Sequence, residues 1–228
     1  EIKNPLTPIQ LSAERLMAKL ADKLTGTDAE LLKRGTGTIV TQVTALKTMV
    51  DEFRQYARLP QAKLVPIHVH DCIREVLNLY ASSPRGCRMT AQYQAQNDYI
   101  LGDGGQLTQV LHNLLGNAMD AVLAQDQSAH ITVSTQDHAQ GLLLRIADNG
   151  PGFSNESLAK LFEPYHTTKS HGTGLGLAIV YRIVQDHHAT IRVKNQLGSA
   201  DEVTGAVVDI VFPRYSMQGQ DFLQGQLV

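Results

Sequence analysis

Two glycine-rich segments in the second half of the chain carry residue types that a nucleotide site needs. The first, residues 148–152 (DNGPG), follows a predicted strand. An aspartate at a strand end can accept a hydrogen bond from an exocyclic amine such as that of adenine, and glycines let the backbone approach a ring. The second, residues 172–177 (GTGLGL), precedes a predicted helix, whose free N–H groups suit phosphate oxygens. A plain turn is the alternative explanation for the first segment.

A long predicted helix between these segments and the first half of the chain has an unusual polar face. Along residues 106–123, Asn113 and Asn117 are four positions apart, so their carboxamides project from one stripe. Mg²⁺ on a nucleotide takes few protein oxygens besides phosphates and waters, which one or two amides can supply. A solvated polar face explains the same residues equally simply.

Two familiar phosphate-binding patterns are excluded by the spacing. A P-loop requires GxxxxGK[ST], which the chain lacks. A dinucleotide fingerprint requires GxGxxG after the first strand of a parallel unit, whereas residues 172–176 read GxGxG and follow a polar loop.

Taken in order, the segments resemble the nucleotide-binding domain of two-component sensor histidine kinases, within the ATPase superfamily that includes gyrase, Hsp90 and MutL. Residues 113–118 resemble the N box and 148–152 the first glycine box. Residues 161–165 resemble the phenylalanine box and 172–177 the second glycine box. Residues 1–16 and 161–180 are most similar to nitrogen-sensor kinases of the NtrY type.

The resemblance implies ATP and Mg²⁺ as ligands. It assigns the adenine amine to Asp148, the triphosphate to Asn113 and Asn117, and Mg²⁺ to Asn117 first and Asn113 second. It also implies that residues 153–172 form a mobile lid, with Lys169 near the γ-phosphate. The full set of implied nucleotide-binding residues is Asn113, Asn117, Asp148, Gly150, Gly152, Tyr165, Lys169, Gly172, Thr173, Gly174, Leu175 and Gly176.

Residues 1–7 (EIKNPLT) resemble the histidine box of the same family. Family members carry the phosphoacceptor histidine immediately before the Glu of this box, and this chain begins with that Glu. We therefore expect a piece of a longer kinase that cannot autophosphorylate by itself. The resemblance implies that Glu1 accepts a proton from the missing histidine and that Asn4 orients a water for a phosphatase reaction.

Residues 1–60 predict two antiparallel helices. Apolar residues recur at alternating spacings of four and three, as in a coiled-coil seam. The seams are Ile2, Leu6, Ile9, Ala13, Leu16 and Leu20, then Leu32, Ile39, Val43, Leu46, Val50, Phe53 and Ala57. Thr27 and Glu30 are spaced like a capping box at the start of the second helix, which Pro60 ends. A hairpin is half of a four-helix bundle, so we expect a homodimer; packing on its own chain is the alternative.

After Pro60 the pattern changes to short strands and separate helices. Strands are expected at 65–69, 89–93, 99–101, 131–135, 142–147, 191–194 and 207–212, with helices at 71–80, 106–123 and 174–187. The strands at 89–93 and 99–101 lie on either side of an Asn97-Asp98 turn. The predicted fold is α+β: an N-terminal helical hairpin followed by a sandwich ATP-binding domain of the histidine kinase/Hsp90-like type.

These elements predict a dimerisation and phosphotransfer hairpin at 1–60, a catalytic ATP-binding domain at 61–213 and a loose tail at 214–228. The 20 Lys and Arg against 22 Asp and Glu give a net charge of −2, which argues against a nucleic-acid partner. The sequence has no apolar run long enough to span a membrane, so we expect no membrane contact by this piece and a cytoplasmic location. By resemblance, the whole protein is expected to be anchored in the bacterial inner membrane.

The resulting functional hypothesis is the catalytic core of a sensor histidine kinase that phosphorylates a histidine and passes the phosphoryl group to a response-regulator receiver domain. Phosphatase activity on that regulator is expected as well. Two alternatives stay open: an ATP-driven conformational ATPase of the same superfamily, and a non-enzymatic nucleotide-binding dimeric scaffold.

Overall fold

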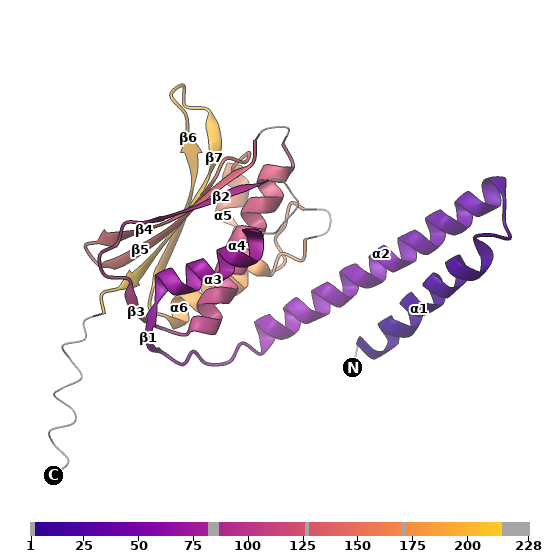
Figure 1. The fold of residues 1–228 in the computed structure, drawn as a ribbon, viewed down its shortest axis with the longest axis horizontal. Helices are drawn as coiled ribbons and strands as arrows, with labels where there is room; N and C mark the ends of the chain where they lie inside the picture. Colours follow the sequence, from indigo (N-terminus) through magenta and orange to yellow (C-terminus); the bar gives the residue numbers. More distant parts are fainter. Residues whose placement is uncertain (1–2, 82–86, 126–127, 170–171, 216–228) are drawn as a thin grey trace, which may run out of the picture. The chain divides into compact units, whose positions relative to one another are not determined.

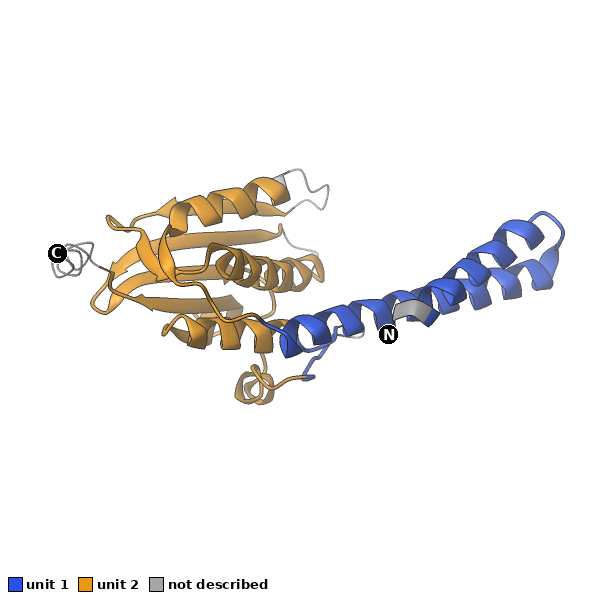
Figure 2. Cartoon of the chain, turned by 90° about the horizontal axis from the view of Figure 1, so that it is seen from below, with its two compact units in different colours: residues 1–59, 165–175 blue, residues 60–164, 176–228 orange. Residues whose placement is uncertain are grey.

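The computed structural model of this chain describes residues 3–81, 87–125, 128–169 and 172–215. They form two compact units (Figure 2). Unit 1 contains Glu1–Leu59 and Tyr165–Leu175, and unit 2 contains Pro60–Pro164 and Gly176–Val228. The segment 165–175, which lies between helices of the second half of the sequence, therefore groups with the N-terminal helices.

Unit 1 is built on two packed helices, α1 (Lys3–Leu20) and α2 (Gly26–Ala57). Leu6 and Ala13 of α1 and Val43 of α2 are buried. Thr36 of α2 is also buried. Its hydroxyl donates a hydrogen bond to the Leu32 carbonyl of the same helix at 2.7 Å, so burial does not leave this polar group unpaired. The contact between the two helices thus uses only part of each apolar stripe.

The other part of each stripe is exposed. These side chains are between 41% and 50% accessible, although they belong to the same predicted seams: Ile9, Leu16, Ile39, Leu46 and Phe53. Removing such side chains from water is favourable, so this face has the composition of a surface that another helix pair would cover.

The start of α2 differs from the sequence prediction. The helix begins at Gly26, its N-cap is Thr25, and the Thr25 side chain makes no capping hydrogen bond. Thr27 lies inside the first turn, where its backbone is already helical, so the predicted capping box with Glu30 is wrong.

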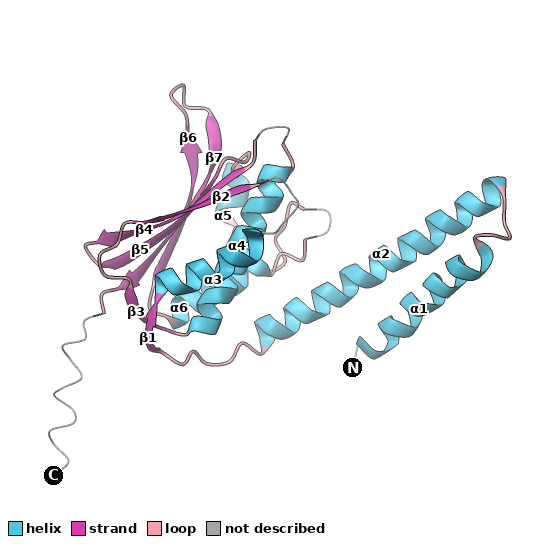
Figure 3. Cartoon of the chain, viewed as in Figure 1, coloured by secondary structure: helices cyan, strands magenta, loops and turns pink. Residues whose placement is uncertain are grey.

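Unit 2 contains a five-stranded sheet with the strand order β2-β4-β5-β7-β6 (Figures 1 and 3). Only β2 runs parallel to its neighbour β4, and the other pairs are antiparallel. The strands are β2 (Arg88–Tyr93), β4 (His130–His138), β5 (Gly141–Asp148), β6 (Thr190–Leu197) and β7 (Val203–Pro213). A separate two-stranded sheet pairs β1 (Val65–His68) with β3 (Tyr99–Gly102).

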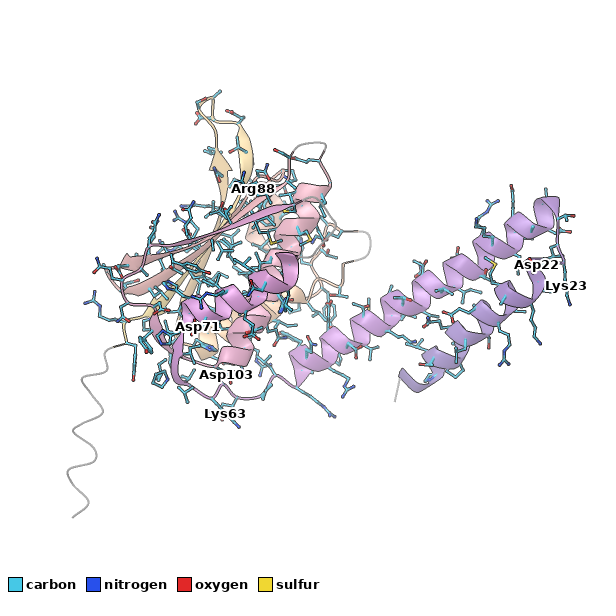
Figure 4. All side chains as sticks on the ribbon, in the orientation of Figure 1. Asp22, Lys23, Lys63, Asp71, Arg88 and Asp103 are labelled. Carbon is cyan, nitrogen blue, oxygen red and sulfur yellow. The ribbon has the colours of Figure 1, made fainter. Side chains whose placement is uncertain are left out.

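Helices cover one face of the larger sheet (Figure 1). They are α3 (Val69–Ala81), α4 (Gly104–Leu123) and α6 (Gly176–Asp186); α5 (Asn155–Ala159) is a single short turn. Asp103, labelled in Figure 4, caps α4 by accepting a hydrogen bond from the Gln106 N–H. The apolar stripe of α4 is buried against the sheet: Leu107, Val110, Leu111, Leu114, Leu115, Ala118, Met119 and Val122. The predicted α+β fold with an N-terminal helical hairpin is confirmed.

The pairing of two predicted strands was not anticipated. β2 and β3 flank the Asn97-Asp98 turn but do not pair with each other, because β2 joins the large sheet beside β4 and β3 pairs with β1. The turn itself is present, since Asn97 Oδ1 accepts the Tyr99 N–H at 3.1 Å. Local turn chemistry therefore identified the bend but not the strand partners.

Two other expectations concern a membrane span and the C-terminal tail. Within the described ranges, no helix combines the length and the apolar character that crossing a bilayer demands. Of the predicted tail at 214–228, residues 216–228 lie outside the described residues.

Candidate functional site

Asp148 is the last residue of β5 and is largely removed from water. Its Oδ1 accepts hydrogen bonds from the N–H groups of Gly150, at 2.9 Å, and Ala206, at 3.3 Å. Burial raises the pKa of the carboxyl above its usual range, and the two N–H donors oppose that rise. Among the described residues no hydrogen bond reaches Oδ2, so this atom can accept one from a ligand.

The loop after Asp148 has little room for side chains at its glycines. A Cβ on Gly150 would lie 3.1 Å from the Ala121 Cβ of α4. Gly152 has φ of +70°, and a Cβ there would lie 2.7 Å from the Asn195 Oδ1. The loop therefore packs closely against α4 and β6, and Gly152 needs the backbone freedom of glycine.

Asn113 and Asn117 lie one turn apart on α4, and both are partly buried. The Asn113 Nδ2 is buried and has no hydrogen-bond partner within the described part of the chain. A Cβ on Gly176 would lie 3.5 Å from the Asn113 Oδ1, so this side chain faces the first residue of α6. An unpaired buried donor costs about 1–3 kcal/mol, which a ligand oxygen would recover.

Unit 2 thus brings together Asp148, Gly150, Gly152, Asn113 and Gly176, with Asn117 on the same helix. The arrangement offers an acceptor for an amine, an amide donor and the N-terminal end of an eleven-residue helix. An adenine and a phosphate chain require these same groups.

The segment 165–175 in unit 1 is held by backbone contacts. The Tyr165 N–H donates to the Gly174 carbonyl at 3.0 Å, and a Cβ on Gly174 would lie 2.5 Å from the Tyr165 carbonyl carbon. Gly174 has φ of +70°, so glycine is required at this position. The Gly172 N–H donates to the Lys169 carbonyl at 3.3 Å, and the Lys169 N–H donates to the Thr167 hydroxyl at 3.1 Å.

Thr173 connects this segment to α2 inside unit 1. Its hydroxyl donates to the Glu52 carboxylate and accepts the Leu175 N–H at 3.3 Å. The Leu175 side chain is fully buried. Tyr165, Lys169, Gly172, Thr173, Gly174 and Leu175 are therefore grouped with the hairpin, apart from the residues assembled in unit 2.

The two predicted catalytic residues lie at the start of the chain. Glu1 is outside the described residues, and Asn4 lies within α1.

Sequence reasoning missed Ala206 and Asn195 as parts of the site. Ala206 lies beside Asp148 on β7, and Asn195 lies beside Ala206 on β6. The predicted strand at 191–194 stopped just before Asn195, whereas β6 continues to Leu197, although asparagine is uncommon in strands. An asparagine inside a strand was the available signal.

Residues 102–216, half of the chain, match the family described as "Histidine kinase-, DNA gyrase B-, and HSP90-like ATPase". The chain belongs to this family. Its curated relatives are sensor histidine kinases, so the resemblance found in the sequence is confirmed.

Among the relatives of this chain is the Nitrogen regulation protein NtrY of Azorhizobium caulinodans, which is 38% identical over 214 residues. The match covers 90% of the chain and 26% of NtrY, and the chain spans about a third of the NtrY-like sensor kinase of Rickettsia bellii.

Two solved structures have the same fold as this chain. The structure of full-length ShkA in complex with AMPPNP has a TM-score of 0.67 at 23% identity and covers 95% of this chain and 45% of ShkA. The structure of the histidine kinase ThkA in complex with the response regulator TrrA has a TM-score of 0.67 at 21% identity and covers 94% of this chain and 60% of ThkA.

Proposed function

We propose that this chain binds ATP, with the adenine amine donating to Asp148. The observation that carries the proposal is the state of this carboxylate: backbone N–H groups hold Oδ1 while Oδ2 has no partner among the described residues. Gly150 and Gly152 keep the adjoining loop free of side chains beside the ring. ShkA, which has the same fold, is solved in complex with AMPPNP, and this supports the same ligand class.

The phosphate chain is assigned to the polar face of α4 and the start of α6. The unpartnered Asn113 Nδ2 fits a phosphate oxygen, and the Gly176 end of α6 favours negative charge. We assign Lys169 and Thr173 to the γ-phosphate side, with Gly172 and Gly174 giving the segment 165–175 the freedom to close.

Carboxamide oxygens are suitable ligands for Mg²⁺, so the donor set on α4 fits this ion. Asn117 is the first candidate ligand and Asn113 the second. When bound there, Mg²⁺ would supply positive charge that offsets the negative charge developing during phosphoryl transfer.

In the whole protein, the acceptor is a histidine immediately before Glu1. Glu1 takes the proton from one ring nitrogen, the other nitrogen forms a bond to the γ-phosphorus, and the bond to ADP breaks. The phosphoryl group then passes to an aspartate of a response-regulator receiver domain, and the ThkA–TrrA complex supports that class of partner. Asn4 orients a water that attacks the aspartyl phosphate of the regulator, so that the acyl-phosphate bond breaks and inorganic phosphate is released.

The exposed seam of α1 and α2 supports a homodimer in which two hairpins form a four-helix bundle. The NtrY-type relatives support nitrogen regulation as the signalling context. We also propose that the chain lies in the cytoplasm and that the whole protein is anchored in the bacterial inner membrane.

Calorimetric titration of the 228-residue chain with MgATP tests the binding proposal. Wild type should bind, and Asp148→Asn should weaken binding roughly ten- to a hundredfold, since a hydrogen bond to a charged group is worth about 1.5–3 kcal/mol. Asp201→Asn, an exposed change in the β6–β7 turn, is the matched control. Equal affinity of wild type and Asp148→Asn would refute the assignment of adenine.

Transfer is tested in a chain extended upstream of Glu1 so that a histidine precedes it. This chain should take up label from [γ-³²P]ATP, and Asn117→Ala should abolish labelling. Asn4→Ala should slow dephosphorylation of the response regulator but leave labelling largely intact. A labelled Asn117→Ala protein would remove Asn117 from the metal site.

A further inference from the structure

Asn195 of β6 makes two hydrogen bonds to the backbone of a single residue. Its Oδ1 accepts the Phe153 N–H at 2.8 Å, and its Nδ2 donates to the Phe153 carbonyl at 2.8 Å. Phe153 directly follows Gly152 and lies in no strand. One side-chain amide therefore replaces the strand partner that Phe153 lacks.

Asn195 and Asp148 stand in the same row of the sheet. Asp148 on β5 is opposite Ala206 on β7, and Ala206 is opposite Asn195 on β6. Residues opposite each other on paired strands point to the same face. Both polar side chains therefore project from the face that carries α4 and α6, with the small Ala206 between them.

The loop 149–153 is held at its start by Asp148 and at its end by Asn195. At its start the Gly150 N–H donates to Asp148, and at its end Phe153 is held by Asn195. Gly152, the residue before Phe153, is packed so closely that a Cβ would overlap the Asn195 Oδ1. The position of the loop relative to Asp148 thus depends on Asn195.

The two bonds require the chemistry of a primary amide at this length. An aspartate would keep the acceptor for the Phe153 N–H but place a second acceptor against the Phe153 carbonyl. An alanine would leave both backbone groups of Phe153 without this partner. Asparagine satisfies both at once, which explains a residue that strands otherwise disfavour.

We propose that Asn195 is a positioning residue for the base end of the nucleotide site: it fixes the loop 149–153 over Asp148 and so sets the space that adenine occupies. The inference rests on the proposed ATP binding. Asn195 acts through the loop and does not contact the phosphates, so its loss weakens ATP and ADP binding equally.

The test compares Asn195→Ala and Asn195→Asp with wild type in the 228-residue chain. We measure dissociation constants for MgATP and MgADP, together with the thermal midpoint. We expect both variants to weaken both nucleotides by the same factor, on the order of tenfold, because two neutral hydrogen bonds are lost or opposed. Gln196→Ala, an exposed neighbour on the same strand, should bind like wild type.

A second measurement separates positioning from a general loss of structure. Amide hydrogen exchange at Phe153 should accelerate in both variants, while the buried strand residue Leu144 keeps its protection. Wild-type affinity in both variants would overturn the inference. So would a loss of ATP affinity that ADP does not share, or exchange that accelerates at Leu144 as much as at Phe153.

Failure of the proposed function gives a different result. If wild type binds no adenine nucleotide, the ATP proposal itself is wrong. If wild type binds, Asp148→Asn binds more weakly, and Asn195→Ala matches wild type, only the role of Asn195 is wrong.

Discussion

The backbone N–H of Asp103 donates a 2.9 Å hydrogen bond to the Nε2 of His187, whose side chain is only 2% exposed. The Nδ1 of the same ring lies 2.8 Å from the Ile183 carbonyl. The ring therefore carries its proton on Nδ1 and uses both nitrogens. Through this ring, the end of α6 holds the N-cap residue of α4, the helix that carries Asn113 and Asn117.

Replacing His187 should destabilise unit 2. His187→Ala leaves the Asp103 N–H without its acceptor and opens a cavity where the buried ring was, so the free energy of unfolding should fall by about 2–4 kcal/mol. Urea denaturation measures it. His188→Asn is the control: this exposed neighbour has φ of +54°, which asparagine tolerates, and should change stability by less than about 0.5 kcal/mol. Equal midpoints for both variants would contradict the role of His187.

The raised pKa of Asp148 predicts a pH-dependent stability cost. Folding favours the protonated carboxyl, so stability falls as pH rises from the usual pKa, about 3.9, through the raised value, and stays reduced above it. Asp148→Asn lacks this penalty, so it should unfold at higher denaturant than wild type at pH 7. The difference should vanish at pH values below both pKa values, where the carboxyl is neutral in both states. A variant no more stable than wild type at pH 7 would show that the two N–H donors offset the burial.

Arg145 and Asp209 face each other across β5 and β7 and form a two-point ion pair, with distances of 2.6 and 2.9 Å. Asp209→Ala leaves the half-buried guanidinium without its carboxylate and should lower the free energy of unfolding by about 1–3 kcal/mol. Lys194 lies 3.7 Å from the same carboxylate but is well exposed, so Lys194→Ala should cost less than about 0.5 kcal/mol. A double-mutant cycle of Arg145→Ala and Asp209→Ala measures the coupling, and additive effects would refute it.

The exposed seam predicts that dimerisation depends on Ile39 and Phe53. Ile39→Glu and Phe53→Glu each place a charge on the apolar face and should convert a dimer to a monomer in light scattering at micromolar concentration. Thr41→Glu changes an exposed residue on the opposite side of α2 and should leave the mass unchanged. A dimer that survives both seam variants would place the interface elsewhere.

Much of the fold could be read from local patterns because those patterns have physical periods. The seams of α1 and α2, the apolar stripe of α4 and the β4–β5 hairpin were predicted from spacings of 3.5, 3.6 and 2. Asp148 and the glycines of both glycine boxes could also be identified from the sequence, because few residue types can occupy those positions. The predicted N-cap of α2 was two residues too late, at Thr27 instead of Thr25. The residue type alone does not determine the backbone angles on which cap geometry depends.

The sequence by itself determined the family, the order of the boxes and the residues that could meet a nucleotide, because each of these depends on neighbours within a few positions. Only the tertiary structure decided which strands pair, and hence that Asn195 lies two strands from Asp148 although 47 residues separate them in the sequence numbering. Strand pairing is set by long-range packing and register, which no local spacing encodes. The surroundings of the Asp148 carboxylate are therefore set by strand register, and the residues that form them come from three strands.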